Sequence, residues 1–564
     1  MKIRCLLLLM FNGLLLLPGC SPRQSYFHDY VKQTFYKDAK VQPVWATTMG
    51  VHEYDGMWPE YSEQSMRQYF DDAKLMLDSL MRYDTTGWSI DDRVDYRSEI
   101  ADLKLVLRDS RINPEWLKSS DFYMKTIYWG LRSVMLSNEL TFDEKQEALI
   151  SRIAQIPQFL ETAGQNLTSS SETDLYCTSL GGDVVSEYIK AYTEVLIDSL
   201  PSRNAEISTI RDKALIAIND FNNLLETEIL DYNLDIKYSG SEDIDFYLNE
   251  YMLFDFDSDS LIILAEKDFS QCDSLYRYYL ALIPGEEYSP RWNDGYSEWP
   301  TNSEARAYYH HEIKQILKFL KDEHILDVPD IFANINFQNI PDYIKHLGYS
   351  TNSFSILSPL ETKSKPTYFI SPDLCKSSED SAVCGIEENP WVRIEILENI
   401  IPGEYYQHYL ALKNKSLTRN IEEFWALKDG WIIYVKELMY QRGFFENNYK
   451  PFADLYKSLR ELALTVIIET GINTGRFDSE SAHAFIESKL GSSGAKEFRR
   501  SNFCSQAFLG FHVSKFLGRL MIIQMREKAR AMEGDNFDLA DFHEKLLSEG
   551  NIPLPLIAWK YGWE

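Results

Sequence analysis

The sequence predicts a mainly α-helical protein with one small β element. Most long segments place apolar residues three to four positions apart, as one face of a helix requires, and few segments alternate as a half-buried strand does. Hydrophobic residues make up 45% of the 564 residues, which is enough for a sizeable core. We therefore expect one large helical unit, with possible lobes at residues 25–285 and 300–564, joined where Pro284, Pro290 and Pro300 cluster.

The individual helices follow from these apolar stripes. The clearest begins near Asn302, because Asn302 and Ser303 can cap a helix and Glu304 suits a first turn. Its apolar face consists of Tyr309, Ile313, Ile316, Leu317 and Leu320. Similar stripes run through residues 63–82, 187–230, 453–470 and 512–532. The best alternating pattern is Pro-Thr-Tyr-Phe-Ile at residues 366–370, which predicts a short strand.

The first 19 residues predict an export signal. Lys2 and Arg4 give a basic start, and an apolar run follows at residues 5–17. A helix that spans a bilayer needs about 20 apolar residues, so this run is too short for a stable membrane anchor. We therefore expect a signal peptide at residues 1–19 and a single mature domain at residues 20–564.

The end of the signal resembles the bacterial lipobox. It reads Leu17-Pro18-Gly19-Cys20, and in a lipobox the cysteine thiol is acylated and the chain is cut just before it. Acyl chains contribute about 0.8 kcal/mol per buried methylene, so fatty acids such as palmitate on Cys20 would hold the protein firmly at a membrane. The sequence thus predicts a lipoprotein of the bacterial cell envelope, and leaves open whether it faces the periplasm or the cell surface.

The net charge and the cysteine positions limit the classes of partner and metal site that we expect. The formal net charge is −29, which repels nucleic acid, so we expect no nucleic-acid partner. The spacing of the cysteines that follow Cys20 fits no zinc pattern, although the pair Cys375 and Cys384 could close a small loop. These cysteines are Cys177, Cys272, Cys375, Cys384 and Cys504.

Residues 391–440 contain the acidic side chains that could form a reactive or metal-binding site. Glu398 and Glu404 flank a Pro-Gly turn, and Asp429 follows 25 residues after Glu404. Three acidic groups on two neighbouring helices could converge on one point, as a metal site or an acid/base pair requires. Two helices with solvated acidic faces would give the same pattern.

Six segments, in the order of the chain, carry a resemblance to a known family. They are residues 90–96 (Ile-Asp-Asp-Arg-Val-Asp-Tyr), 365–369, 429–434, 470–473, 537–543 and 552–556. With residues 398–404, they resemble the bacterial family catalogued as domain of unknown function 885 (DUF885), which is related to zinc metallopeptidases of the gluzincin type. The resemblance covers nearly all of the mature chain. It implies a large two-lobed, metallopeptidase-like helical fold with a small β element near the cleft.

The family signature reads His-Glu-x-x-Pro-Gly-His, in which two histidines bind zinc and the glutamate activates the attacking water. A later glutamate completes the metal site. Here Pro402 and Gly403 fix the register, and every functional position differs. The histidine positions hold Glu398 and Glu404, the catalytic glutamate position Asn399, the third-ligand position Asp429, the downstream histidine position Asn473 and a site tyrosine position Lys515.

These departures imply that the zinc mechanism is lost. Imidazole suits zinc, whereas carboxylates suit harder cations, so Glu398, Glu404 and Asp429 would hold calcium, magnesium or manganese if they hold any metal. Asn399 cannot take a proton from a metal-bound water. We expect no cofactor, and we expect Lys515 to pair with a site carboxylate in place of the metal.

Three functions remain open. The first is a non-catalytic pseudoenzyme that binds a peptide or a glycan in the old cleft. The second is a divergent hydrolase that uses Glu398, Glu404 and Asp429, with or without a hard cation, for example in glycoside cleavage. The third is a structural subunit of a larger envelope complex, with the cleft filled.

The lipobox yields a direct prediction. Cys20→Ser should leave the precursor uncut and unlipidated, because the thiol that accepts the lipid is gone. Incorporation of radiolabelled palmitate measures this outcome, and normal labelling of the variant would contradict the assignment.

Overall fold

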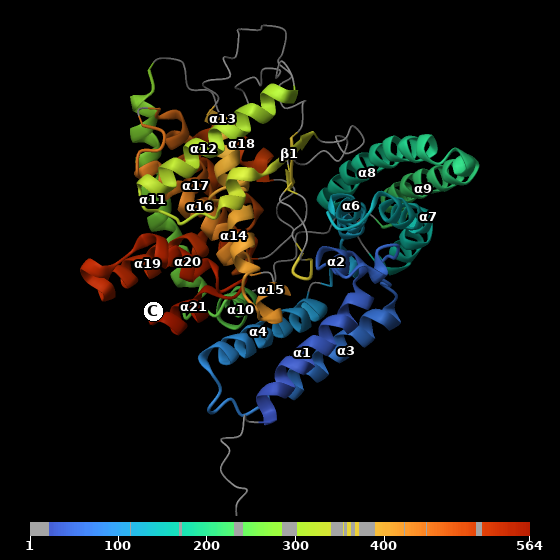
Figure 1. Cartoon of the computed structure of the whole chain (residues 1–564), viewed down its shortest axis with the longest axis horizontal. Helices are drawn as coiled ribbons and strands as arrows, with labels where there is room; N and C mark the ends of the chain where they lie inside the picture. Colours follow the sequence, from blue (N-terminus) through green and yellow to red (C-terminus); the bar gives the residue numbers. More distant parts are fainter. Residues whose placement is uncertain are drawn as a thin grey trace, which may run out of the picture.

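In the computed structural model, most of the described residues lie in helices (Figure 1). The prediction of a mainly α protein with a small β element is confirmed. No helix among the described residues is long and apolar enough to cross a membrane. Cys20 lies outside these residues, which are 22–112, 114–168, 172–229, 241–284, 302–339, 353–354, 358–361, 367–370, 390–421, 424–446, 448–502 and 510–564.

The first helices form a small group of their own. α1 and α3 lie side by side, with α4 packed against α3 (Figure 1). Phe27, Val31, Met76, Leu80 and Trp88 form the core between them. The elements are α1 (Pro22–Val41), α2 (Pro43–Thr48), η1 (His52–Tyr54), α3 (Glu63–Leu80) and α4 (Ile90–Ile112).

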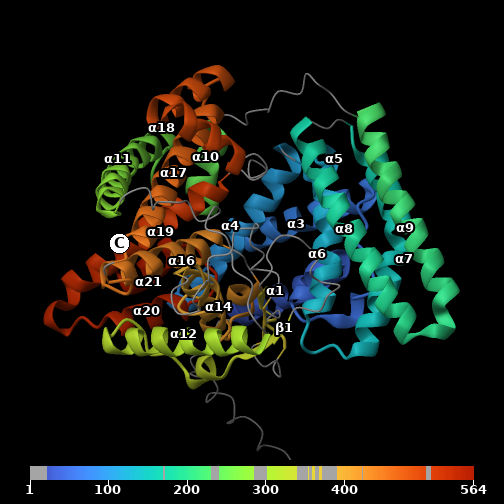
Figure 2. The same cartoon turned by 90° about the horizontal axis from the view of Figure 1, so that it is seen from above.

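The next helices form a bundle to one side of the molecule (Figures 1 and 2). The stripe predicted across residues 187–230 is divided into two packed helices, because Leu200 precedes Pro201 and proline cannot continue the backbone hydrogen bonds. The elements are α5 (Glu115–Lys118), α6 (Ser120–Leu136), α7 (Phe142–Asn166), α8 (Glu172–Ser199), η2 (Pro201–Arg203), α9 (Asn204–Leu224) and η3 (Leu225–Ile229).

The remaining helices form the largest body. α11 packs along α17, and α16 packs along α19. Helices from both sides of residues 285–300 in the sequence therefore pack together, since α11 precedes that segment and α17 follows it. The helices are α10 (Ser241–Phe246), η4 (Tyr247–Tyr251), α11 (Ser258–Leu282), α12 (Asn302–Asp322), η5 (Asp330–Asn334), α13 (Pro390–Asn399), α14 (Glu404–Ala411), α15 (Leu417–Ile421), α16 (Trp425–Gln441), α17 (Lys450–Asn473), α18 (Ser479–Asn502), α19 (Phe511–Glu533), η9 (Gly534–Asn536), α20 (Leu539–Leu547) and α21 (Leu554–Tyr561).

One small sheet adjoins this body. Its strands are β1 (Asn336–Asn339), β2 (Ser353–Phe354) and β3 (Thr367–Ile370), in the order β1-β3-β2. β3 pairs in parallel with β1 and antiparallel with β2. The predicted strand is thus the central strand, and the described part of it begins at Thr367.

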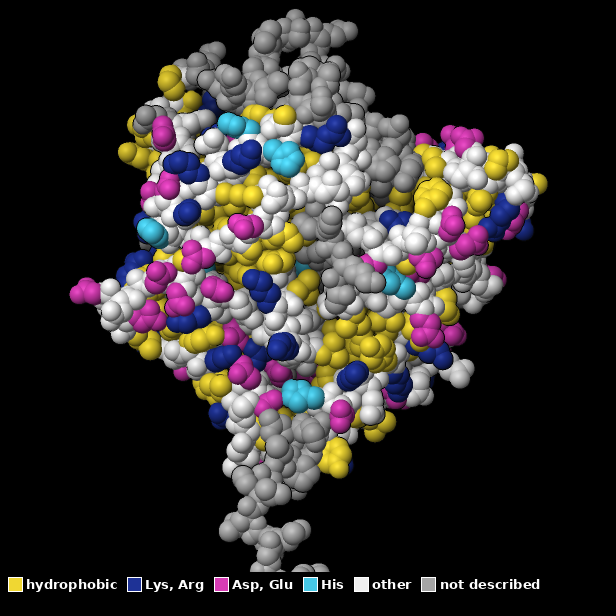
Figure 3. All heavy atoms as spheres, viewed as in Figure 1, with side chains coloured by type: hydrophobic (Ala, Val, Ile, Leu, Met, Phe, Trp, Pro, Cys, Tyr) yellow, Lys and Arg dark blue, Asp and Glu magenta, His cyan; other side chains and the backbone are white. Residues whose placement is uncertain are grey.

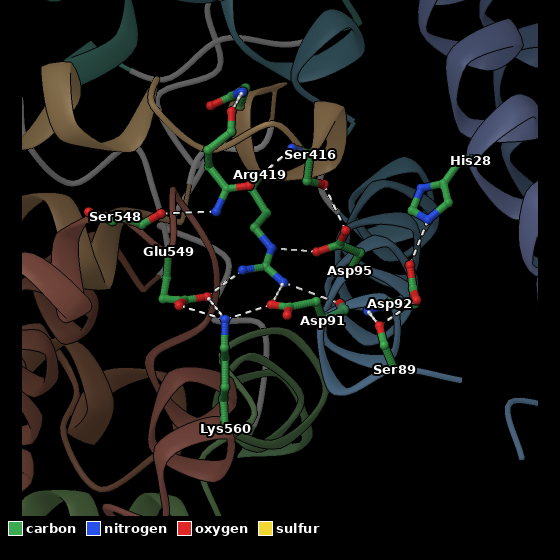
Figure 4. A network of polar contacts seen from close by, with 12 residues as sticks. His28, Ser89, Asp91, Asp92, Asp95, Ser416, Arg419, Ser548, Glu549 and Lys560 are labelled. Atoms are coloured by element: carbon green, nitrogen blue, oxygen red, sulfur yellow. Dashed lines mark hydrogen bonds and ion pairs between the residues drawn. The ribbon is translucent and has the colours of Figure 1, made fainter. Parts of the chain in front are cut away.

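A buried arginine joins three distant parts of the chain (Figure 4). Arg419 of α15 is only 2% exposed, and its Nε lies 2.5 Å from Oδ1 of Asp95 in α4. It also contacts Asp91 of α4 at 2.9 Å and Glu549, which precedes α21. Lys560 of α21 closes the network by contacting both Asp91, at 2.6 Å, and Glu549, at 2.7 Å. Removing one partner from a buried pair typically costs about 3–5 kcal/mol, so this network fixes α4 on the C-terminal helices.

The cysteines have different surroundings. Cys272 of α11 is a buried free thiol, and burial raises its pKa well above the usual range. Cys177 of α8 is disulfide-bonded. Cys375, Cys384 and Cys504 lie outside the described residues.

A neutral histidine lies in the core of the largest body. His543 of α20 is fully buried, and its Nδ1 lies 2.8 Å from the carbonyl oxygen of Ile325. Because a carbonyl can only accept a hydrogen bond, Nδ1 carries the proton, and Nε2 accepts a bond from the Tyr434 hydroxyl at 2.8 Å. Burial lowers the pKa of His543 to about 3.

This histidine should make stability depend on pH. Below about pH 6.5 His543 is protonated in the unfolded chain but stays neutral in the folded protein. The unfolded state is therefore favoured progressively, and stability is lost as the pH falls from 6.5 towards 3. Between pH 7 and pH 5 this group should contribute a loss of about 2 kcal/mol. Urea unfolding of His543→Gln at both pH values should show a loss smaller by about that amount than wild type shows.

His311→Gln, at an exposed position of α12, is the matched control and should keep the wild-type dependence. Equal pH dependence in wild type and His543→Gln would show that His543 is not buried in its neutral form.

Candidate functional site

The candidate site is built on a close crossing of α16 and α19. A Cβ atom on Gly518 would lie 1.9 Å from the carbonyl oxygen of Ala426, and one on Gly430 would lie 2.5 Å from the backbone of Gly518. Neither position tolerates a side chain, so the two helices touch through their backbones. Asp429, which precedes Gly430, and Lys515, three residues before Gly518, are thereby brought together.

The turn between α13 and α14 is fixed on the same helix. A Cβ atom on Gly403 would lie 1.9 Å from the carbonyl oxygen of Glu398, so the tight turn requires glycine. The indole Nε1 of Trp431 donates a 2.7 Å hydrogen bond to the carbonyl oxygen of Pro402. The Pro402-Gly403 turn therefore packs against α16 beside the residue that follows Gly430.

Lys515 pairs with Asp429, as the resemblance led us to expect. Its Nζ lies 3.7 Å from Oδ2 of Asp429, and it also lies 4.0 Å from the centre of the Phe511 ring. Burial raises the pKa of Asp429, while the positive charges of Lys515 and Lys428 oppose that rise. An ammonium group thus lies beside the carboxylate at the position that the resemblance assigns to a third metal ligand.

The other two carboxylates have lysines of their own. Glu398 lies 2.5 Å from Nζ of Lys436, and Glu404 lies 3.0 Å from Nζ of Lys428. Lys428 and Lys436 are eight residues apart on α16, a little over two helical turns, so both can face the α13–α14 turn.

Each acidic residue therefore faces a lysine rather than one shared point. Glu404 lies close enough to Asp429 to raise its pKa, but Glu398 faces Lys436. Among the described residues, no group of three or more histidine, cysteine, aspartate or glutamate side chains could hold a metal. The chemistry of the donors agrees, because three carboxylates without imidazole do not fit zinc.

The two remaining motif positions also have polar neighbours. Asn399 hydrogen-bonds Tyr368 of β3 and lowers its pKa, although burial raises that pKa overall. Asn473 donates a 2.8 Å bond to the carbonyl oxygen of Glu469 in its own helix. Its amide thus bonds the backbone of α17, where the family resemblance would place a histidine facing the site.

A tyrosine–glutamate cluster beside the turn was not found by sequence reasoning. Glu395 accepts a 2.7 Å hydrogen bond from the Tyr368 hydroxyl of β3 and bonds from Tyr309 of α12 at 3.2 and 3.3 Å. Glu395 lies one turn before Glu398 on α13, which is the one signal in the sequence that could have drawn attention to it. The cluster ties the sheet and α12 to the helix that begins the motif.

Two solved structures resemble this fold. A candidate lipoprotein of unknown function from Shewanella oneidensis is 17% identical, with a TM-score of 0.67 over 95% of this chain and 99% of that one. A candidate lipoprotein from Colwellia psychrerythraea is 15% identical, with a TM-score of 0.70 over 96% of this chain and 98% of that one. At this identity the likeness shows a shared fold. A search among curated proteins finds no match.

The profile of a bacterial family of unknown function, DUF885, matches residues 43–560. That range includes the α13–α14 turn, the glycine crossing of α16 and α19, and the Arg419 network. This chain therefore belongs to the DUF885 family of bacterial proteins.

Proposed function

We propose that this protein is a lipid-anchored envelope protein whose metallopeptidase-like site has become a non-catalytic binding site for a peptide or a glycan. The observation that supports this most directly is that each of the three carboxylates is paired with a lysine of α16 or α19. Three ammonium groups thus supply the positive charge that a metal ion would otherwise provide to the carboxylates.

The donor set argues against a zinc hydrolase. Asn399 stands where a general base is needed and cannot accept a proton from water. Lys428, Lys436 and Lys515 would repel an incoming cation. The disagreement with the family signature thus concerns the base and the ligands together.

The arrangement suits binding because its charges remain partly accessible. The side chain of Glu404 is 48% exposed, and those of Lys428 and Lys515 are 30% and 29% exposed. Both signs of charge are therefore offered next to each other, which suits a zwitterionic peptide or a glycan with several polar groups.

One observation favours the divergent-hydrolase alternative. Burial raises the pKa of Asp429, and a general acid needs a raised pKa. Lys515 and Lys428 oppose this shift, since both stabilise the charged carboxylate. We therefore rank this alternative second, and the activity measurements below test it directly.

The lipid anchor rests on the lipobox at Cys20 and on the resemblance to two candidate lipoproteins. α1 begins at Pro22, two residues after Cys20. The folded body would then lie close to the membrane surface, facing either the periplasm or the outside of the cell.

The first prediction of this proposal concerns zinc. Purified residues 21–564 should contain less than stoichiometric zinc by elemental analysis, because both histidine ligands are replaced. Peptides and oligosaccharides incubated with the protein should stay intact by mass spectrometry, with or without a chelator. One tightly held zinc per chain, with an activity abolished by Glu404→Ala, would overturn the proposal, and a zinc-independent cleavage lost in Asp429→Asn would establish the hydrolase instead.

The second prediction concerns the Lys515–Asp429 pair. Lys515→Met leaves a mostly buried carboxylate without its counter-ion, and an unsatisfied buried polar group costs about 1–3 kcal/mol. The melting temperature should therefore fall clearly. The double variant Lys515→Met with Asp429→Leu should lose less, because the unpaired charge is gone.

Lys528→Met, at an exposed position of the same helix, is the matched control and should melt like wild type. Added calcium or manganese should partly restore Lys515→Met by filling the vacancy. If Lys515→Met instead melts like wild type while calcium stabilises the wild type by several degrees, the site is a metal site and the pair is unimportant.

A further inference from the structure

A second polar site lies between α11, α17 and α18, which gather at one end of the molecule (Figures 1 and 2). It is a cavity of about 520 Å³. It shares no residue with the site between α13, α16 and α19. Its charged lining residues are Arg277, Lys457, Arg460, Lys489, Glu461 and Glu497.

The lining reverses the charge balance of the chain. The whole protein has 57 lysines and arginines against 86 aspartates and glutamates, whereas this cavity has four basic side chains and two acidic ones. Burial raises the pKa of Glu461, while the positive charges of Lys457 and Arg460 oppose that rise. The cavity thus has a mostly basic charged lining on a protein of net negative charge, whose acidic and basic side chains are interspersed on the face drawn in Figure 3.

Two of the four basic groups keep N–H donors that are not used in ion pairs. Arg277 gives only its Nε to Asp273, at 2.7 Å, and among the described residues its terminal amino groups have no partner. Among the described residues, the Lys489 ammonium lies over the rings of Phe269 and Phe485, at 5.5 and 5.1 Å from their centres, and forms no ion pair. An ammonium and a guanidinium with free N–H groups therefore line the same cavity.

The other two basic groups are held in place. Arg460 donates from NH1 to Asp273 at 2.7 Å and stacks on the Tyr276 ring at 4.0 Å. Lys457 is 8% exposed and donates to Glu497 at 2.8 Å. Asp273 contacts both arginines, so one carboxylate fixes two guanidinium groups side by side.

Two glycines of α18 form part of the wall of this cavity. Gly491 has a φ of +73°, a conformation that favours glycine, and it interrupts α18 beside Lys489. Gly491 and Gly494 both line the cavity, and nothing lies within 4 Å of a Cβ placed on Gly491. This part of the wall is therefore backbone, with room for a ligand to approach.

We propose that this cavity binds a small phosphate-bearing molecule. Arginine forks and a lysine ammonium together match the several oxygens and the double charge of a phosphate group better than they match a single carboxylate. The volume lies in the range of about 300–1,000 Å³ that is usual for small-molecule sites, so the phosphate has room for an organic group attached to it.

Calorimetric titration of purified residues 21–564 tests this proposal. The ligands are inorganic pyrophosphate, glycerol 3-phosphate and acetate, at constant ionic strength so that general screening is matched. The two phosphates should bind and acetate should not. The double variant Arg277→Gln with Lys489→Gln should weaken phosphate binding at least tenfold, since it removes the two groups with unused donors.

The matched control is Lys528→Gln with Arg530→Gln on α19, which removes the same charge from exposed positions and should change affinity less than twofold. Vesicles of phosphatidylglycerol and of phosphatidylcholine identify the source of the phosphate. Binding that is restricted to phosphatidylglycerol vesicles and is lost in the Arg277 and Lys489 variant assigns the site to a lipid headgroup. No binding of any phosphate ligand, or equal weakening in both double variants, would overturn the proposal.

Discussion

The contact between Gly430 and Gly518 is the constraint on which the candidate site depends. It brings the backbones of α16 and α19 together, so the residue before Gly430 and the residue one turn before Gly518 meet as the Asp429–Lys515 pair. The next residue of α19, Arg519, enters the core and contacts Glu437 of α16 at 2.8 Å and Asp268 of α11 at 3.1 Å. A larger residue at either glycine would separate the helices and disturb both the partly exposed pair and the buried network.

The Arg419 network plays the corresponding part for the whole chain. The segments that resemble DUF885 near residue 90 and near residue 552 are far apart in sequence, and neither contains an obvious reactive group. In the structure they flank one buried guanidinium, which contacts Asp91, Asp95 and Glu549 (Figure 4). A buried guanidinium needs hydrogen-bond acceptors for all of its N–H groups. This requirement explains why acidic residues occur in segments whose other residues mainly pack against neighbouring helices.

Local patterns were sufficient for the mainly helical fold class, for several of the helices and for aligning the motif that the resemblance suggested. The apolar stripe after Asn302 became α12, and Pro402-Gly403 aligned the site positions without a gap, so the Lys515–carboxylate pair could be expected. The partners of Glu398 and Glu404 could not, because a lysine side chain reaches over a turn of helix and its direction depends on packing between α13, α14 and α16. Glu395 was missed for the same reason, since its tyrosine partners come from α12 and β3. The break at Pro201 was a local signal that the continuous apolar stripe concealed.

Under the proposed function, the three lysine–carboxylate pairs explain why loss of the zinc signature would not leave a weakened metal site. A divalent cation would have to draw Glu398, Glu404 and Asp429 to one point, whereas the lysines hold Glu398 towards one end of α16 and Asp429 towards α19. Binding a cation would therefore break three ion pairs and leave three ammonium groups near the bound charge. Exposed pairs are worth only about 0–1 kcal/mol each, but the pairs here are half-buried, and the repulsion between a cation and the displaced lysines adds to their cost. Lysines and a metal ion are thus alternative ways to balance the charge of three carboxylates, and the proposed function assigns the first of them to this chain.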